Sequence, residues 1–275
     1  MKRTTTGIFM IVMLFLYGCI QKTDWQIAPE NQDLVVVNAV ITDAIGSQSV
    51  SLSSPVSGLN EIPSPISGAN VLITEQDSIY HLTEQPASPG IYLTGTNFLA
   101  KPGKTYTLQI YYKNNFYTAK AAMDPGFTFN PFLYSKDTDD TLYHIDYVAS
   151  VFSPDNPAMW EILLDWSGVP GYEGQDTSKC KARLLFYTLT TLDVSEIFAP
   201  EVEKIKFPSG TSVTESRYSL APAHAEFIRE MLLETSWQGG IFNSAPANVT
   251  TNMSKGATGF FAACSKTTTY FFITP

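Results

Sequence analysis

The sequence predicts a mainly β protein, with an N-terminal immunoglobulin-like β-sandwich followed by a β-rich C-terminal domain that carries one prominent helix. Three observations support this prediction. The 275 residues are 44% hydrophobic and 13% aromatic, and Thr, Ser, Val and Tyr are plentiful. Short apolar or alternating runs recur between Pro, Gly, Asn and Asp turn residues, as in β-sandwiches. Only one stretch has clear helical periodicity.

Residues 1–18 have the features of a lipoprotein signal peptide. Lys2 and Arg3 precede the apolar run Ile8–Leu16, which is shorter than the roughly 20 residues that a membrane-spanning helix needs. Leu16-Tyr17-Gly18-Cys19 resembles the lipobox of bacterial lipoproteins. We therefore expect Cys19 to be acylated and to become the first mature residue, anchored through more than one lipid chain. The alternative is an uncleaved apolar segment with an ordinary cysteine.

Residues 19–33 are polar and irregular, and we expect them to be a lipidated tether. The chain has 17 basic and 26 acidic residues. Removal of Lys2 and Arg3 with the signal peptide leaves 15 − 26 = −11 for the mature part. This balance argues against nucleic acid as a partner and against electrostatic docking on anionic lipid. Asp24, shortly after Cys19, resembles a weak form of the signal that exports lipoproteins of the Bacteroidota to the cell surface.

The predicted sandwich covers residues 34–125. Its first run, Leu34–Thr42, is β-branched and nearly continuous, as expected of a buried strand. The further predicted strands are 49–53, 70–74, 79–82, 90–93, 105–112 and 116–121. Seven short strands with turn signals between them are typical of an immunoglobulin-like sandwich.

Asp124-Pro125-Gly126 is the predicted boundary, and residues 126–275 form the predicted C-terminal domain. The runs 144–152, 159–166, 183–189, 259–264 and 267–273 are predicted strands. Ile197 to Thr214 gives no clear pattern. Pro222 suits a first helical turn, and Phe227, Ile228, Met231 and Leu232 form a stripe at helical spacing.

Cys180 and Cys264 remain as an even pair once Cys19 is assigned to the anchor. Disulfides persist in compartments outside the cytosol, so we expect a bond between these two residues. Two separate buried thiols are the alternative.

The sequence contains no recognisable catalytic motif, and we expect no enzyme activity, no catalytic residue, no metal and no cofactor. H-E-x-x-H, G-x-S-x-G, Walker and Rossmann patterns are absent. His81, His144 and His224 have no second ligand at metal spacing. Asp137, Asp139 and Asp140 could hold calcium, but the distal glutamate of an EF-hand loop is missing, which favours a solvated acidic loop.

Four aromatic residues are the candidate ligand-binding set: Trp160, Trp166, Phe129 and Tyr134. Flat aromatic side chains suit sugars or peptides. Most such residues in β proteins fill the core, and that alternative stays open.

Several motifs together resemble a domain-of-unknown-function family of Bacteroidota lipoproteins. They are the lipobox, Gly68-Ala69-Asn70-Val71, Pro102-Gly103-Lys104-Thr105-Tyr106, Thr251-Asn252-Met253 and Gly256-Ala257-Thr258-Gly259-Phe260-Phe261. Members of that family tend to be encoded beside TonB-dependent receptors, which are outer-membrane β-barrels. The resemblance implies a lipoprotein of the outer membrane, on the cell surface, that acts as an accessory or substrate-capture partner of such a transporter. A structural or adhesive surface protein is the alternative, and an envelope hydrolase with an unfamiliar site is a third reading.

Overall fold

The computed structural model describes residues 34–56, 58, 60–138, 141–193, 197, 204–237 and 249–275. The predicted signal peptide, Cys19 and the tether 19–33 lie outside these residues, as do Asp139 and Asp140. The described part of the chain is mainly β, as predicted. None of its helices is both long and apolar enough to cross a membrane.

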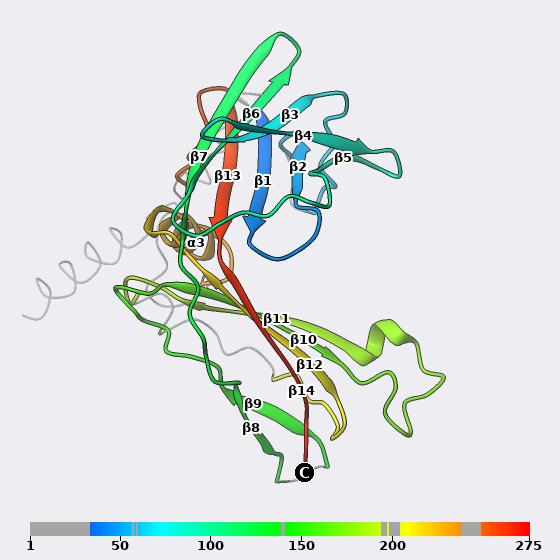
Figure 1. The fold of residues 1–275 in the computed structure, drawn as a ribbon. Coiled ribbons are helices and arrows are strands. Elements are labelled where there is room, and N and C mark those ends of the chain that lie inside the picture. The colour runs from blue at the N-terminus through cyan, green and yellow to red at the C-terminus, as the bar shows by residue number, and fades with distance from the viewer. Residues whose placement is uncertain are drawn as a thin grey trace, which may run out of the picture. The chain divides into compact units, whose positions relative to one another are not determined.

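Eight strands form a closed barrel in the order β1-β13-β7-β6-β3-β4-β5-β2 (Figure 1). Side chains alternate between the buried interior and the surface along these strands, as the burial of β6 and β7 shows. The strands are β1 (Val35–Thr42), β2 (Ser49–Ser53), β3 (Asn70–Glu75), β4 (Ser78–Gln85), β5 (Ser88–Leu93), β6 (Thr105–Tyr112), β7 (Asn115–Asp124) and β13 (Ala257–Cys264).

The closed barrel differs from the predicted immunoglobulin-like sandwich, which is not confirmed. The difference lies in β13, which comes from near the end of the chain and pairs in parallel with both β1 and β7. All eight residues of β1 pair with β13, from Val35↔Ala257 to Thr42↔Cys264. The barrel is therefore built from residues on both sides of Asp124, where β7 ends.

A short polar segment joins β13 to β7 where these two strands do not pair directly. Direct pairing is limited to Ala263↔Met123 and Cys264↔Asp124. Elsewhere Asn252 bridges the gap: its Nδ2 donates to the Lys120 carbonyl at 3.1 Å and to the Phe261 carbonyl at 2.7 Å, and its Oδ1 accepts from the Phe261 N–H at 3.0 Å. Asn252 thus completes the barrel wall with its side chain.

A second sheet has four strands in the order β11-β10-β12-β14, and β8 and β9 form a separate pair (Figure 1). Only Ser265 separates β13 from β14, so the last part of the chain passes directly from the barrel into this sheet. The elements are β8 (Leu133–Lys136), β9 (Tyr143–Tyr147), β10 (Ala158–Asp165), η1 (Thr177–Cys180), β11 (Lys181–Thr188), β12 (Ser212–Ser219) and β14 (Lys266–Phe272).

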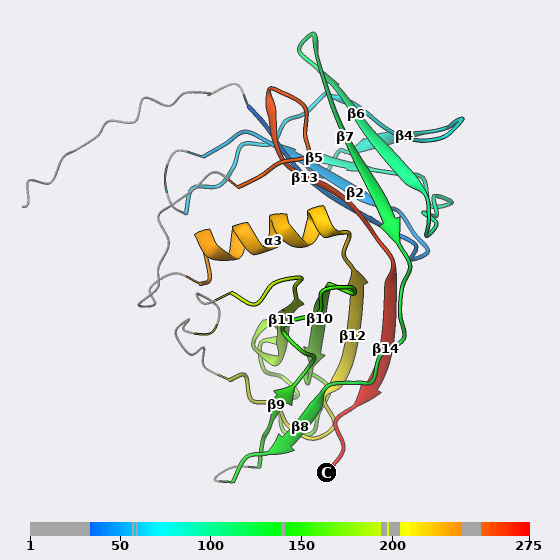
Figure 2. The same cartoon turned by 90° about the vertical axis from the view of Figure 1, so that its left-hand side faces the viewer.

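The predicted helix is confirmed as α3 (Pro222–Glu234), with a proline in its first turn. It buries His224, Ala225, Ile228 and Leu232. Ala225, Ile228 and Leu232 share a hydrophobic cluster with Phe260 and Ala262 of β13 and with Tyr218 of β12, and the His224 ring stacks on Phe260. The helix accordingly packs between the barrel and one end of the four-stranded sheet (Figure 2).

The expected disulfide between Cys180 and Cys264 is not formed, and both residues are buried free thiols. Cys180 precedes β11 beside the Asp165 end of β10, whereas Ser265, which follows Cys264, accepts a hydrogen bond from Ser219 at the Ala158 end. An eight-residue strand separates these ends by about 23 Å, and a disulfide needs Cα atoms within about 7 Å. The two thiols belong to different hydrophobic clusters.

Candidate functional site

The four predicted ligand-binding residues do not form one site. Trp160 and Phe129 meet edge to face, with ring centroids 5.0 Å apart. Trp160 is largely buried, and its Nε1 donates to Thr188 Oγ1 at 3.1 Å. Trp166 belongs to a hydrophobic cluster that includes neither Trp160 nor Phe129, and Tyr134 is packed against that cluster. The core-filling alternative therefore accounts for most of their surface, although both tryptophans also line hollows.

Trp160 forms one wall of an aromatic pocket of about 360 Å³. β9 and the segment after it line one side, and Leu185, Phe186 and Tyr187 of β11 line the other. Apolar pockets of about 300–1,000 Å³ with few polar groups are typical small-ligand sites. Its aromatic residues are Tyr147, Trp160, Phe186, Tyr187 and Trp237.

The charged side chain among the residues that line this aromatic pocket is Asp146. Its Oδ1 lies 3.0 Å from His144 Nε2 and accepts a hydrogen bond from Ser135 Oγ at 3.0 Å. The carboxylate is thus already engaged by neighbours on β8 and β9. Sequence reasoning missed Tyr147, Tyr187 and Trp237, because no spacing in the chain connects these three positions.

Trp166 lines a second hollow of about 530 Å³, which we call the lysine pocket. It lies at the start of β11, and its other wall is the segment Lys204–Lys206. Lys206 pairs with Asp137, and Lys181 pairs with Asp165. The four lysines that line the pocket are Lys179, Lys181, Lys204 and Lys206. Such a gathering of positive charge is unusual in a chain with a formal charge of −9.

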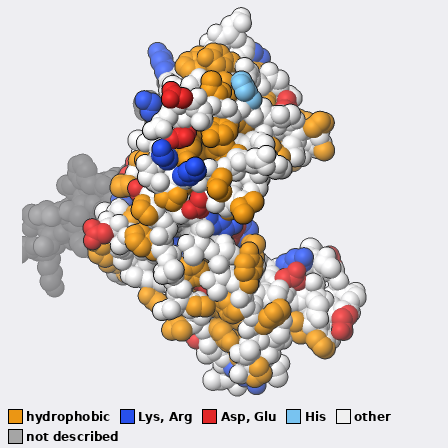
Figure 3. All heavy atoms as spheres, in the orientation of Figure 1, with side chains coloured by type: hydrophobic (Ala, Val, Ile, Leu, Met, Phe, Trp, Pro, Cys, Tyr) orange, Lys and Arg blue, Asp and Glu red, His pale blue; other side chains and the backbone are white. Residues whose placement is uncertain are grey.

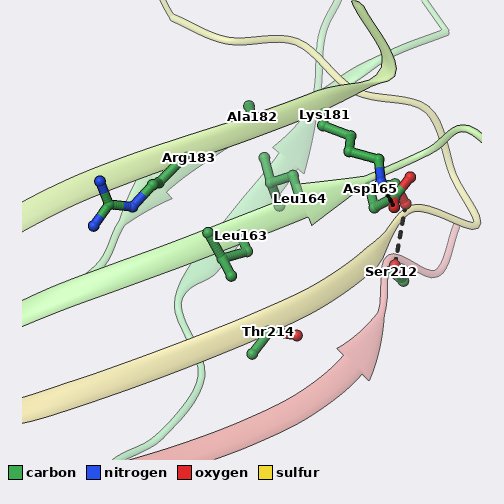
Figure 4. A pocket seen from close by; sticks show the side chains of 8 residues that line it. All are labelled: Leu163, Leu164, Asp165, Lys181, Ala182, Arg183, Ser212 and Thr214. Atoms are coloured by element: carbon green, nitrogen blue, oxygen red, sulfur yellow. Dashed lines mark hydrogen bonds and ion pairs between the residues drawn. The ribbon is translucent and has the colours of Figure 1, made fainter. Parts of the chain in front are cut away.

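A third hollow of about 520 Å³ lies over one face of the four-stranded sheet (Figure 4). Figure 4 shows Lys181 of β11 beside Asp165 of β10, whose backbone carbonyl accepts from Ser212 Oγ at 3.2 Å. Hydrogen bonds from the Ser167 hydroxyl and N–H lower the pKa of Asp165 to about 2. Asp165 is therefore a permanent anion that orients Lys181. Residues of β11 line the aromatic pocket, the lysine pocket and this third hollow.

Two charged side chains are buried on the central strand β12. Glu215 has no exposed surface, and burial raises its pKa to about 7 although the Phe132 N–H donates to its Oε2 at 3.0 Å. Arg217 lies 5.7 Å from the Trp160 ring and donates to Ser219 Oγ at 2.9 Å. Burial lowers the pKa of Arg217. Both residues contact the segment that carries Phe127, Phe129 and Phe132, and neither lines one of the three hollows described above.

A buried thiol and imidazole meet where α3 packs on β13, with Cys264 Sγ 3.5 Å from His224 Nδ1. Burial raises the pKa of Cys264 to about 12 and lowers that of His224 to about 4. Both groups are thus neutral, unlike the thiolate that a nucleophilic cysteine requires. Across the described ranges, no three His, Cys, Asp or Glu side chains come together as a metal-binding group.

The family described as Domain of unknown function (DUF4249) matches residues 22–270. No curated protein matches the chain. The match includes both the barrel and the four-stranded sheet with its three hollows. This chain belongs to the DUF4249 family.

Proposed function

We propose that this protein is a non-catalytic, lipid-anchored binding protein of the outer membrane that captures a ligand for a TonB-dependent transporter. The observation that carries the proposal is the aromatic pocket beside β11, which has the size and lining of a ligand site. The resemblance of Leu16–Cys19 to a lipobox supports the anchor, and the resemblance to a lipoprotein family whose members tend to be encoded beside TonB-dependent receptors supports the partner. The cell surface is the proposed location, because a captured nutrient must reach the outer side of the transporter.

The anchor is tested with Cys19→Ala. This variant has no thiol to acylate, so we expect it to keep its leader and to leave the detergent-phase fraction, while wild type partitions with membranes. Intact mass measures both the cleavage and the added acyl chains. If Cys19→Ala differs in mass from wild type only by the replaced side chain and partitions as wild type does, lipidation at this residue is ruled out.

The partner is tested by purifying the tagged full chain from membranes solubilised in mild detergent. We expect a TonB-dependent receptor to co-purify with the full chain at a fixed ratio. A variant that lacks the anchor but keeps Tyr147 and Trp237 should lose the receptor only if the shared membrane is what brings the two proteins together. Cross-linking before solubilisation separates these cases. Recovery of the lipoprotein alone, with and without cross-linking, would contradict the proposed partnership.

One observation favours the alternative of an adhesive surface protein. Beside the turn between β6 and β7, the rings of Tyr111 and Phe116 are tilted against each other with centroids 4.7 Å apart, and the two residues are 47% and 48% exposed. Hydrophobic side chains are also spread over the face shown in Figure 3. Tyr111→Ser with Phe116→Ser should reduce cell adhesion under this alternative, whereas ligand capture at the aromatic pocket should be unaffected.

A further inference from the structure

We propose that the outer edge of β11, which has no partner strand before Leu189 among the described residues, binds an extended peptide as an added strand. Acidic peptide residues lie against the basic end of β11 and apolar ones lie in the aromatic pocket. The inference rests on the proposed function of ligand capture and names the class of ligand. Strand addition combines backbone hydrogen bonds, which give affinity, with side-chain pockets, which give selectivity.

Half of the backbone N–H and C=O groups of β11 point away from its neighbour β10. β11 lies at one edge of its sheet and pairs only with β10 among the described strands (Figure 1). The Trp166 N–H donates to the Cys180 carbonyl at 2.9 Å, just beyond the end of the β10–β11 ladder. Antiparallel pairs alternate between bonded and non-bonded. The backbone groups of the odd-numbered residues of β11 therefore point away from β10: Lys181, Arg183, Leu185 and Tyr187.

The next odd residue supports this assignment. The Leu189 N–H donates to the Val151 carbonyl at 2.9 Å, and the Leu189 carbonyl accepts from the Ser153 N–H at 2.9 Å. Leu189 thus already pairs on the side away from β10, in parallel with Phe152. The outward backbone groups of β11 before Leu189 have no strand partner among the described residues.

Two hollows beside the outer edge of β11 leave room for an added strand. The aromatic pocket lies between β11 and residues 145–151, and the lysine pocket lies between the start of β11 and Lys204–Lys206. The far walls of these two hollows are linked, because Tyr143 and Phe207 exchange backbone hydrogen bonds of 2.8 and 3.0 Å. The outer edge of β11 therefore has hollows of 360 and 530 Å³ toward its two ends, and an added strand lies about 4.8 Å away.

The charged side chains around the start of β11 are mainly basic. Lys179, Lys181, Arg183, Lys204 and Lys206 gather around the first half of β11, in a chain with only 17 basic residues. The Lys181 and Arg183 side chains are 54% and 63% exposed while they pair with Asp165 and Glu161. Complementary charge speeds association and sets register. An occupant with acidic residues at this end and aromatic or aliphatic residues at the other matches both halves of the edge.

The inference is tested with fluorescein-labelled eight-residue peptides and the full chain in mild detergent. Two peptides carry three acidic residues at either the amino or the carboxyl end, and Val, Tyr and Trp at the other. Anisotropy should show tighter binding of one order than of the other, which gives the strand direction. N-methylation of alternate residues on one edge of the preferred peptide should weaken binding about tenfold, equivalent to one or two net hydrogen bonds. N-methylation of the opposite set should have little effect.

A matched pair of variants locates the site. Lys179→Glu with Lys204→Glu should weaken binding about tenfold, since two favourable charges become repulsive. Lys120→Glu with Lys255→Glu makes the same charge change at exposed positions on and beside the barrel and should leave binding unchanged. Amide hydrogen exchange of Arg183 and Leu185 should slow when the peptide is bound, and thermal unfolding should show that each variant is folded.

Absence of peptide binding, or equal effects of the two N-methylation patterns, would overturn the inference. It would also be overturned if polygalacturonate, an acidic polysaccharide, bound at the same edge and the peptide did not compete with it. Each result is distinguishable from failure of the proposed function. A co-purifying TonB-dependent receptor with no peptide binding removes only the peptide class, whereas peptide binding without any receptor removes only the transporter role.

Discussion

At the scale of single residues, Glu215 makes folding depend on pH. Burial raises its pKa from 4.5 to about 7 in the folded protein. Between these values the folded state keeps a proton that the unfolded chain loses, so stability falls as pH rises from 4.5 to 7. The resulting loss in the free energy of unfolding is fully present above pH 7 and amounts to roughly 3 kcal/mol.

Glu215→Gln should remove this part of the pH dependence. We expect the variant to be more stable than wild type at about pH 8 and close to wild type at about pH 4, as measured by urea unfolding. Glu161→Gln is the matched control on β10. Burial opposes ionisation of Glu161, but hydrogen bonds from Arg183 and Tyr218 outweigh it and lower its pKa. That variant should therefore lose stability at neutral pH, and a gain in both variants would contradict the assignment.

Gly259 is the residue that lets β13 approach β1. Its φ is +91°, and a Cβ at this position would lie 2.0 Å from the Val37 carbonyl oxygen. Gly259→Ala should therefore cost at least about 3 kcal/mol, because the backbone of two paired strands has to move. Gly95→Ala is the control, since a Cβ there meets no atom within 4 Å. Similar unfolding free energies for the two variants would disprove the close approach as the reason for this glycine.

At the scale of elements, Asn252 substitutes for missing strand pairing between β7 and β13. Its side-chain amide makes three hydrogen bonds to the backbones of Lys120 and Phe261. Asn252→Ala would leave partly buried backbone groups without partners, so we expect a loss of about 2–3 kcal/mol. Asn97→Ala, at an exposed turn position, should change stability by less than about 0.5 kcal/mol. Urea unfolding with equal midpoints for the two variants would refute this role.

Sequence reasoning found the elements whose periodicity is clear. Thr105–Tyr112 alternates and was predicted with the bounds that β6 has, and the apolar stripe around Ile228 predicted α3. β12 was not predicted, because Ser212–Ser219 contains Glu215 and Arg217 where a central strand usually has apolar residues. Of the site, Trp160 was predicted from its residue type alone. Tyr147 and Trp237 reach the same pocket only through tertiary packing, which no local pattern encodes.

At the scale of the whole molecule, the chain is organised by a strand that returns from its far end. The sequence predicts a sandwich whose strands all lie within residues 34–125, because the strand patterns and turn signals in that range are enough for seven strands. Pairing between β1 and β13 spans more than 200 positions, as in Val35↔Ala257. Because side-chain alternation is the same in a sandwich and in a barrel, nothing in the first half of the sequence distinguishes the two.

This topology predicts that residues 34–125 do not fold by themselves. Without β13, β1 and β7 would each expose an unpaired edge and the barrel interior would open to water, including the surface that Phe261 covers. We expect the fragment to show no cooperative thermal transition by circular dichroism. Joining residues 249–264 behind position 125 through a flexible linker should restore the transition, because this segment supplies both Asn252 and β13. The same fusion with Gly259→Ala should fail to do so, and cooperative unfolding of residues 34–125 alone would show that the returning strand is dispensable.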